Sequence, residues 1–547
     1  MGRNYEHLSR EELISLLLAR DRRDETKFGL VWEANEIERD KALNSDFIAL
    51  DLDPALSVGE APWRNLIIEG DNFDALRHLK MTFSGRIKCI YIDPPYNTGN
   101  KDFVYNDHFV EKEDLWRHST WCEFIFQRLS LARDLLTEDG VIFVSIDDNE
   151  MPSLRLLLNK VFGEGKHVAT CVWQKRYSRE NREAIGDVHE YITVYAIDPE
   201  IFKTTRNRIP LDEAQAKIYR NPDNPKETDP AKRWRGLPMT AQGWRPNQMY
   251  EITAPNGKKH NPPEGRCWSM LESEYLKLRV ANRIYWGKDG NAQPSVIRFL
   301  SEVEGLVPWT WWTHEEVGHT DEARKEIQSI FGTQSAFDTP KPVRLMERIL
   351  QIATNPGDIV LDFFAGSGTT GHAVLKKNLE DGGDRRFILV SSTEATLDSP
   401  EKNLCRDICA ERIRRVIEGQ TTVKGAEVEG LSGNFAYLRC RKIAPSHLLE
   451  IEHKQVWTAL QLIHRPNLMP YKEAPFLVAE GGDDATLIYV PRFHKKILPK
   501  LRETVMRHAA VVIYSWQPGL LLQHLRADHV QHEAIPESLA RRFGLKS

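Results

Sequence analysis

Residues 87–96 of this 547-residue chain read IKCIYIDPPY and carry its strongest structural pattern. Its first six residues form a short apolar run with the length and composition of a buried β-strand, and Asp93 follows that run directly. The two prolines stiffen the backbone and remove two N–H donors, so the carbonyl oxygens remain as acceptors. The sequence therefore predicts a strand that ends in a rigid, acceptor-rich turn beside the ring of Tyr96.

Strands and helices alternate on both sides of this stretch. Such alternation predicts a parallel sheet with right-handed crossovers, and hence an α/β fold. We expect Gly140 to stop the helix that precedes the strand VIFVSI. The expected strands are 66–68, 141–146, 358–363 and 387–390, and the expected helices are 73–79, 121–136, 372–378 and 406–418.

A second motif, VLDFFAGSGTT, covers residues 360–370. A strand that leads into a loop of small residues before a helix lets a ligand approach the backbone closely. The Gly-Lys-Ser/Thr ending of a phosphate-binding loop is absent, which excludes a Walker motif. Taken alone, the loop is equally consistent with a tight strand–helix turn that binds nothing.

Composition indicates a soluble, multidomain protein. The length predicts two to four domains, and the sequence has neither an apolar run that could span a bilayer nor an N-terminal signal peptide. The seven scattered cysteines are typical of reduced thiols in a cytoplasmic protein. Cys405 and Cys409 lie one helical turn apart, but two ligands do not make a zinc site, so we expect no metal.

The region 166–330 interrupts the strand–helix alternation and contains eight of the 14 tryptophans. Within it, residues 201–270 contain 13 basic and 7 acidic side chains, a net charge of 13 − 7 = +6, although the whole chain has a charge of −5. Basic side chains among aromatics suit phosphate contact and base stacking, whereas most of the tryptophans suit the core of an irregular insert. The candidate DNA contacts are Lys175, Arg176, Arg233 and Arg235.

These patterns predict five segments. They are an N-terminal helical segment (1–45), a first catalytic part (46–165), a target-recognition insert (166–330), a second catalytic part (331–424) and a small C-terminal α/β domain (425–547). In the last of these, we expect strands at 486–489 and 511–514 and a basic helix near 495–508.

The DPPY residues have a specific chemistry. Asp93 and the carbonyl of Pro94 make an acceptor-only pocket, and the exocyclic amine of a nucleobase has two donors that fit it. Tyr96 offers a flat face on which a base flipped out of a duplex can stack, and Pro95 completes the stiff turn.

The DPPY turn and the FAGSG loop together resemble the amino-methyltransferases of DNA. Their order, with DPPY first, resembles the permuted beta class. The strings DPPYNTGNKDFVYNDHF, GVIFVSIDDNE and DTPKPVRLMERIL are similar to the modification subunits of type III restriction-modification systems. The resemblance covers residues 60–425. It implies a Rossmann-like S-adenosyl-L-methionine-dependent methyltransferase sheet, duplex DNA as substrate, a homodimer, and a nuclease-helicase restriction partner.

The resemblance also implies roles for individual residues. Asp93 and Pro94 would bind the N6 amine of adenine, and Tyr96 would stack on its ring. Asp71 would face the adenine of the cofactor, and Glu394 would hold its ribose hydroxyls. The remaining cofactor residues would be Asp362, Phe363, Gly366 and Gly368 in the loop and Thr339, Lys341 and Pro342 at the methionine end.

Three other functions stay open at this point. N4-cytosine methylation uses the same scaffold, but family members with that activity usually begin the motif with Ser, so Asp93 favours adenine. Methylation of RNA is a second alternative. The third is a catalytically silent DNA-specificity subunit, which would not need to retain Asp93, Tyr96, Gly366 and Gly368 together.

Overall fold

The structure is a computed structural model that describes most of the chain beyond residue 45. The described residues are 46–99, 104–105, 108–109, 117–178, 184–333, 336–396, 399–421, 425, 427–464, 467–480 and 485–545. The expected N-terminal helical segment lies outside them. The chain forms two compact units, of which the second is Asn207–Pro308 and the first contains the described residues on either side of it.

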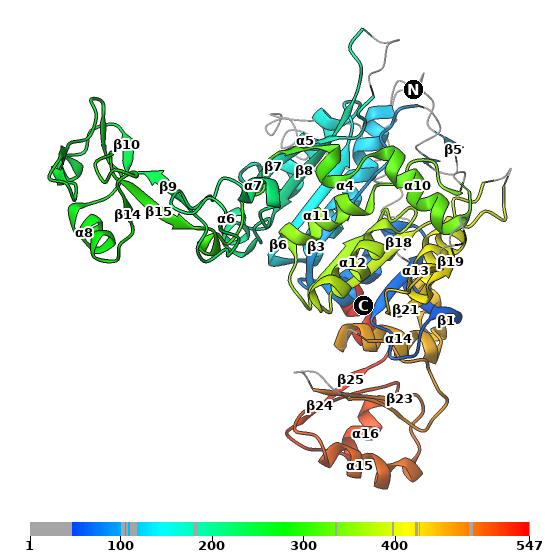
Figure 1. Ribbon diagram of the computed structural model, residues 1–547. Helices are drawn as coiled ribbons and strands as arrows, with labels where there is room; N and C mark the ends of the chain where they lie inside the picture. The colour runs from blue at the N-terminus through cyan, green and yellow to red at the C-terminus, as the bar shows by residue number, and fades with distance from the viewer. Residues whose placement is uncertain are drawn as a thin grey trace, which may run out of the picture. The chain divides into compact units, whose positions relative to one another are not determined.

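A ten-stranded sheet is the centre of the first unit (Figure 1). Its six central strands are parallel, each to the next, which confirms the predicted α/β fold. In spatial order the strands are β1 (Phe47–Val58), β21 (Phe435–Ile443), β2 (Asn65–Glu69), β18 (Arg386–Ser391), β17 (Ile359–Asp362), β3 (Ile87–Ile92), β6 (Leu136–Ile146), β8 (His189–Ala196), β7 (His167–Gln174) and β16 (Trp311–Trp312).

Two layers of helices cover this sheet. One layer packs α4 against α3 and α5, with α14 against α3, and the other packs α12 against α11 and α13, with α10 against α13. Figure 1 shows α11 and α12 in front of the strands. The helices are α3 (Asn72–Phe83), α4 (Arg117–Leu135), α5 (Met151–Phe162), α10 (Thr320–Phe331), α11 (Val343–Ala353), α12 (Thr369–Asp381), α13 (Glu411–Glu418) and α14 (His453–His464).

The structure corrects the predicted start of strand β6. Helix α4 ends at Leu135, and the strand begins at Leu136, so Gly140 lies inside the strand and does not stop the helix. The pairing of β3 with β6 shifts register between Leu136 and Val141. The residues between them bulge from the ladder, and a Cβ on Gly140 would lie 2.8 Å from the Thr137 carbonyl oxygen. Gly140 therefore allows the close approach of the backbone at this β-bulge.

The other expected elements lie close to their predicted positions. Strand β3 has the predicted bounds, and β2, β17 and β18 each differ from the prediction by one residue at each end. The helix expected at 406–418 begins with a π-helical turn, Cys405–Ala410, before α13. Among the described residues, no helix has both the length and the apolar composition that crossing a membrane requires.

The first unit extends beyond the segments expected to build it. Strands β7, β8 and β16 belong to the central sheet although they lie in the expected insert, and β21 lies between β1 and β2 although it follows residue 425. The reason is pairing: β7 and β8 form an antiparallel hairpin that continues the sheet from β6. The second compact unit is therefore shorter than the expected insert.

The C-terminal residues form a separate four-stranded sheet within the first unit. Its strands are β22 (Leu477–Ala479), β23 (Thr486–Val490), β24 (Val511–Ser515) and β25 (Val530–Ala534), in that order. The two strands predicted at 486–489 and 511–514 are β23 and β24, and the predicted basic helix is α15 (Leu498–Met506) with a 3-10 turn before it.

The second unit is an irregular α+β module. Strand β15 (Ser295–Phe299) pairs with β14 (Ile284–Tyr285) and β9 (Trp234–Pro238), and α8 (Glu272–Val280) adds Tyr275 to the core. Trp268 and Trp286 are buried in that core, as the packing alternative predicted, but Trp244 is 70% exposed. The two ends of the unit meet, because Ile209 and Leu306 exchange backbone hydrogen bonds of 2.9 and 2.7 Å.

The position of β21 generates a stability prediction. Leu438 in β21 is fully buried in the main core, so Leu438→Ala should lower the free energy of unfolding by about 2–5 kcal/mol. Leu449 is 74% exposed, and Leu449→Ala should change it by no more than about 0.5 kcal/mol. Urea unfolding of both variants checks this. Equal midpoints for the two variants would contradict the placement of β21 in the sheet.

Candidate functional site

The two sequence motifs meet at one edge of the central sheet. Strand β17 pairs in parallel with β3, with Val360 opposite Cys89 and Leu361 opposite Ile90. The carboxyl ends of both strands therefore place Asp362 and Asp93 at the same edge, although about 270 residues separate them in the chain. Open α/β sheets bind their ligands at the carboxyl ends of the strands. The ligand lies where the connections from two neighbouring strands lead to opposite sides of the sheet.

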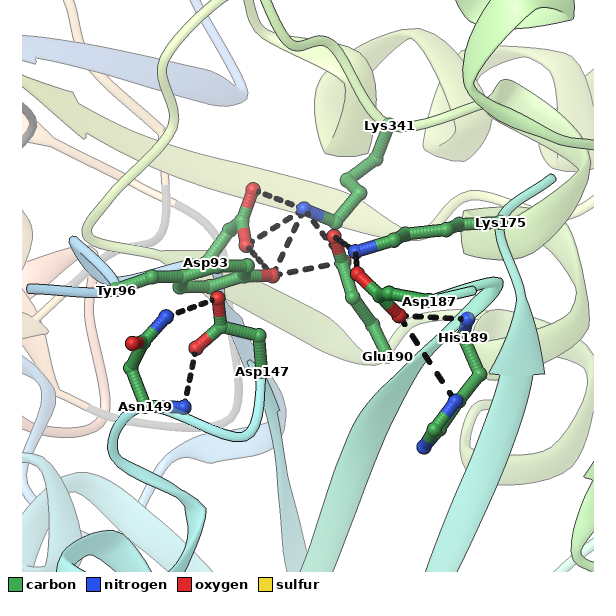
Figure 2. Close-up of polar contacts among 9 residues, drawn as sticks. All are labelled: Asp93, Tyr96, Asp147, Asn149, Lys175, Asp187, His189, Glu190 and Lys341. Atoms are coloured by element: carbon green, nitrogen blue, oxygen red, sulfur yellow. Dashed lines mark hydrogen bonds and ion pairs between the residues drawn. The ribbon is translucent and has the colours of Figure 1, made fainter. Parts of the chain in front are cut away.

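The Asp93 carboxylate is bound by a lysine of this chain. The Lys341 Nζ lies 2.8 and 2.7 Å from its two oxygens and 3.0 Å from the hydroxyl oxygen of Tyr96. Tyr96 in turn donates a hydrogen bond of 2.8 Å to Asp93. Figure 2 shows the three side chains converging on one point. The acceptors of the DPPY turn thus bind an ammonium group in this structure.

A glutamate that the sequence analysis missed completes the group. Glu190, in β8, has an oxygen 3.0 Å from the Tyr96 hydroxyl, whose single proton it shares with Asp93, and the same oxygen lies 3.4 Å from the Lys341 Nζ. Its other oxygen lies 3.5 Å from the Nζ of Lys175, which also pairs with Asp187 at 2.8 Å. Glu190 was missed because it lies in the hairpin that we expected to belong to the insert.

Burial and charge act in opposite directions on the central pair. Burial raises the pKa of Asp93 above its usual range; Lys341 lowers it, and Glu190 raises it further. Burial opposes the charged form of Lys341, but the carboxylates of Asp93 and Glu190 outweigh it, so the pKa of Lys341 is raised. The ammonium therefore stabilises the Asp93 carboxylate in a site that would otherwise favour the protonated acid.

The backbone of the DPPY turn is held from two sides. The indole nitrogen of Trp121 donates a hydrogen bond of 2.7 Å to the Pro95 carbonyl oxygen. Asn97, the residue that follows the DPPY turn, has a positive φ of 57° and is buried. Its side-chain amide donates a hydrogen bond of 2.5 Å to the buried carboxylate of Glu150. Since the Pro95 carbonyl is used within the fold, the Pro94 carbonyl is the one that remains as an acceptor candidate.

The glycine loop forms a close-fitting turn after β17. Gly366 and Gly368 both have positive φ, 49° and 78°, and a Cβ at Gly366 would lie 3.0 Å from the ring of Phe337. Asp362 is buried, accepts hydrogen bonds from the Phe364 N–H at 3.0 Å and the Thr370 hydroxyl at 2.6 Å, and has a pKa raised by burial to about 7. Phe363 is also buried.

A fully buried arginine supports this loop. The Arg412 guanidinium, at the start of α13, donates to the hydroxyls of Ser367 and Thr369 at 3.1 and 2.8 Å. Glu326 of α10 lies 3.8 Å from it and supplies the opposite charge. The loop conformation is therefore fixed by the protein itself. Sequence analysis did not identify Arg412, because its partner Glu326 is distant in the chain.

A second arginine orders the turn after β2. Asp71 caps α3 by accepting from the Phe73 and Asp74 N–H groups, and its side chain is 53% exposed. Arg128 is buried and lies 3.1 Å from the Asp71 carboxylate. Asn72 also contacts Arg128, and its side-chain amide donates a hydrogen bond of 2.9 Å to the Phe363 carbonyl oxygen. Asp71 and the glycine loop are thereby joined at the same edge.

The remaining cofactor candidates differ in environment. Pro342 is buried at the start of α11, and Thr339 is exposed. Glu394 has a positive φ of 51°, and its exposed side chain pairs with Lys402 at 2.8 Å. Glu69, at the end of β2, is a more enclosed acid near the same strand ends, and it binds Asn403 at 2.9 Å. The described residues contain no group of three metal-ligating side chains.

The predicted DNA contacts separate into three environments. Lys175 is only 12% exposed and belongs to the Glu190 network, whereas Arg176 is exposed. In the second unit, Arg233 donates to the backbone carbonyls of Ala216 and Tyr219, so it is structural, and Arg235 stacks on the Tyr219 ring.

In this Rossmann-like sheet, the glycine loop and the DPPY turn share one carboxyl edge. A family model described as DNA methylase matches residues 87–397, more than half of the chain. The chain therefore belongs to this DNA methylase family, which confirms the resemblance seen in the sequence.

Three curated relatives show the range of similarity. The StyLTI Mod subunit of a type III restriction-modification enzyme from Salmonella typhimurium is 37% identical over 382 residues, 64% of this chain and 57% of that protein. The EcoPI Mod subunit from Escherichia phage P1 is 31% identical over 66% of this chain and 63% of its own length. The type II methyltransferase M.KpnI from Klebsiella pneumoniae is 30% identical over 66% of this chain and 88% of its own length. The chain thus spans less than two thirds of the two Mod subunits.

The raised pKa of Asp362 generates a prediction about pH and stability. The folded state keeps its proton up to a pKa of about 7, whereas the unfolded state loses it near 3.8, so the contribution of this group to stability is present at low pH and is lost as the pH rises toward 7. Between pH 5 and pH 8, this loss should be on the order of 2–3 kcal/mol.

Asp362→Asn should remove that part of the pH dependence, because the amide does not ionise. Urea unfolding of wild type and variant at pH 5 and pH 8 measures the difference. Asp384→Asn, at a 52% exposed aspartate, is the matched control and should behave like wild type. The same pH dependence in wild type and Asp362→Asn would rule out the protonated Asp362.

Proposed function

We propose that this chain transfers a methyl group from S-adenosyl-L-methionine to N6 of an adenine extruded from duplex DNA, as the modification component of a restriction-modification system. One observation supports it above the others: the acceptors of Asp93 and Tyr96 bind a nitrogen that has only N–H donors, the ammonium of Lys341. The exocyclic amine of adenine presents the same chemistry. Asp93 at the first position of the motif, where N4-cytosine enzymes usually have Ser, favours adenine.

The glycine loop fits the proposed cofactor. The positive φ values of Gly366 and Gly368 exclude most side chains, and Arg412 fixes the loop from beneath. The loop backbone and Asp71 would hold S-adenosyl-L-methionine, which supplies an electrophilic methyl group when bound. Glu69 or Glu394 would meet its ribose hydroxyls.

The residues of the DPPY turn would bind and orient the target amine. Asp93 and the Pro94 carbonyl would accept the two N–H bonds of the amine, which favours a pyramidal nitrogen with a localised lone pair. The Tyr96 ring would support the extruded base. After transfer the nitrogen is cationic and acidic, so Asp93 can take its proton without being a strong base. Neither step needs a covalent bond between enzyme and base.

The second compact unit is the proposed DNA-reading part. It contains 16 basic and 12 acidic residues, a net charge of 16 − 12 = +4, against −5 for the whole chain. Trp244 is 70% exposed and is followed by the exposed Arg245, a pair suited to stacking and phosphate contact. This pair adds to the DNA contacts predicted from the sequence.

The expected partners follow from the relatives. StyLTI Mod and EcoPI Mod are named as subunits of type III restriction-modification enzymes, so we propose that this chain also acts with a restriction subunit. A homodimer and a cytoplasmic location stay predictions from the sequence.

Catalysis is tested with Asp93→Ala. Purified protein, tritium-labelled S-adenosyl-L-methionine and unmethylated genomic DNA should give labelled N6-methyladenine, which nucleoside mass spectrometry distinguishes from N4-methylcytosine. Asp93→Ala should lose at least about 10²-fold of the rate, because the amine loses its charged acceptor, while DNA binding persists. Asp384→Ala, at an exposed aspartate on the same unit, should label like wild type. Labelling that survives in Asp93→Ala would refute the assigned role.

DNA recognition is tested by deleting the second unit. Because Ile209 and Leu306 pair, a short Gly-Ser linker can replace residues 207–308. The deletion variant should bind S-adenosyl-L-methionine in calorimetry like the full chain, because the glycine loop lies wholly in the first unit. Its affinity for duplex DNA should fall by at least about tenfold. Unchanged DNA affinity would contradict the assignment of the second unit.

A further inference from the structure

The charged acceptor of the proposed amine pocket, the Asp93 carboxylate, is already bound by a side chain of the protein. The Lys341 ammonium contacts both Asp93 oxygens and the Tyr96 hydroxyl at 3.0 Å or less. The N6 amine of adenine would use the same Asp93 carboxylate, together with the Pro94 carbonyl. The amine and the ammonium compete for this carboxylate, so we expect a base that enters to displace Lys341 from Asp93.

A displaced ammonium needs another partner, because a cation left alone in a site with little water is costly. Lys341 is 10% exposed and lies over the rings of Tyr96 and Trp173, with its nitrogen 5.1 and 5.8 Å from their centres. Glu190 is the second carboxylate beside it, with an oxygen 3.4 Å from the nitrogen. Figure 2 shows the Lys341 nitrogen between Asp93 and Glu190.

Glu190 also binds the other group that the base would touch. The Glu190 oxygen nearest Lys341 also lies 3.0 Å from the Tyr96 hydroxyl. The opposite oxygen faces Lys175 at 3.5 Å, and Lys175 is held by Asp187. Glu190 is therefore fixed from behind by one lysine while it faces the other, and its position in β8 makes it part of the rigid sheet.

We propose that Glu190 is a positioning residue of the amine pocket: it retains the Lys341 ammonium when the amine of the target base takes that ammonium's place at Asp93, and it holds the Tyr96 hydroxyl throughout. The inference rests on the proposed function, because it requires that an amine enters this pocket. Before the base arrives, Lys341 is an internal substitute for the amine. Afterwards it remains beside Asp93 as a positive charge bound to Glu190.

The pH profile is a readout that a merely structural role would not move. The ionisable groups that face Asp93 are Lys341, Glu190, Tyr96, Tyr91 in β3 and Asp362 in β17. Glu190 has the same charge as Asp93, so its neutralisation lowers the pKa of Asp93. Asp93 must be ionised to accept the amine. The acid limb of the methylation rate should therefore move to lower pH in Glu190→Gln.

The experiment compares Glu190→Gln with the matched control Glu164→Gln, at an exposed glutamate of the same unit. With enzyme in excess over sites in unmethylated genomic DNA and saturating S-adenosyl-L-methionine, the single-turnover rate of Glu190→Gln should fall on the order of 10²-fold, as expected for a misplaced acceptor. The dissociation constants for DNA and cofactor should stay those of wild type. Glu164→Gln should match wild type in all respects.

A second measurement does not depend on activity. Acylation of lysines by an N-hydroxysuccinimide ester, followed by peptide mass spectrometry, reports how accessible the Lys341 amine is. With duplex DNA bound, so that the base occupies Asp93, Lys341 should be protected in wild type and Glu164→Gln and should react several-fold faster in Glu190→Gln. A Glu190→Gln variant with wild-type rate and pH profile, or with unchanged Lys341 protection, overturns the inference while wild-type methylation still supports the proposed function. A wild-type protein that methylates no DNA overturns both.

Discussion

Asp93 and Lys341 are 248 residues apart in the chain, and their charged atoms are 2.7 Å apart in the fold. A partly buried ion pair of this kind is weak evidence for stability, because desolvation offsets most of the attraction. Its value here is chemical. Burial raises the pKa of Asp93 and Lys341 lowers it, and a protonated acid could not offer acceptors on both oxygens to an amine. The ammonium therefore favours the ionised carboxylate on which the chemistry of the DPPY turn depends.

The pair also explains why two distant motifs belong to one site. Lys341 lies two residues before α11, which packs with α12, the helix that begins at the glycine loop. Asp93 ends β3, which pairs with the strand that leads into that loop. Chain order is therefore irrelevant to the site, because parallel neighbours in a sheet bring their carboxyl ends together whichever motif comes first. A permuted sequence yields the same edge with the same groups.

Much of the fold could be predicted from sequence, because buried parallel strands are continuous apolar runs, and IKCIYI became β3 with the predicted bounds. Strand pairing across the chain could not: β21 and the β7–β8 hairpin join the sheet through contacts that leave no local pattern. The same limit applies to charges. Lys175 looked like a DNA contact, because a sequence shows that a lysine is present but not that Asp187 and Glu190 already bind it.

The groups that sequence analysis missed share one property: each contacts and supports the residues of a recognised motif. Arg412 lies beneath the glycine loop, Arg128 binds Asp71, and Glu190 lies behind Lys341 and Tyr96. All three are enclosed charges paired with distant partners, and an enclosed charge is costly unless its geometry is fixed. Such residues fix the motif before any ligand arrives, so the free energy of ordering the site is contributed by folding and not by binding. Motifs name the groups that touch a ligand, and the packing behind them determines whether those groups are already in place.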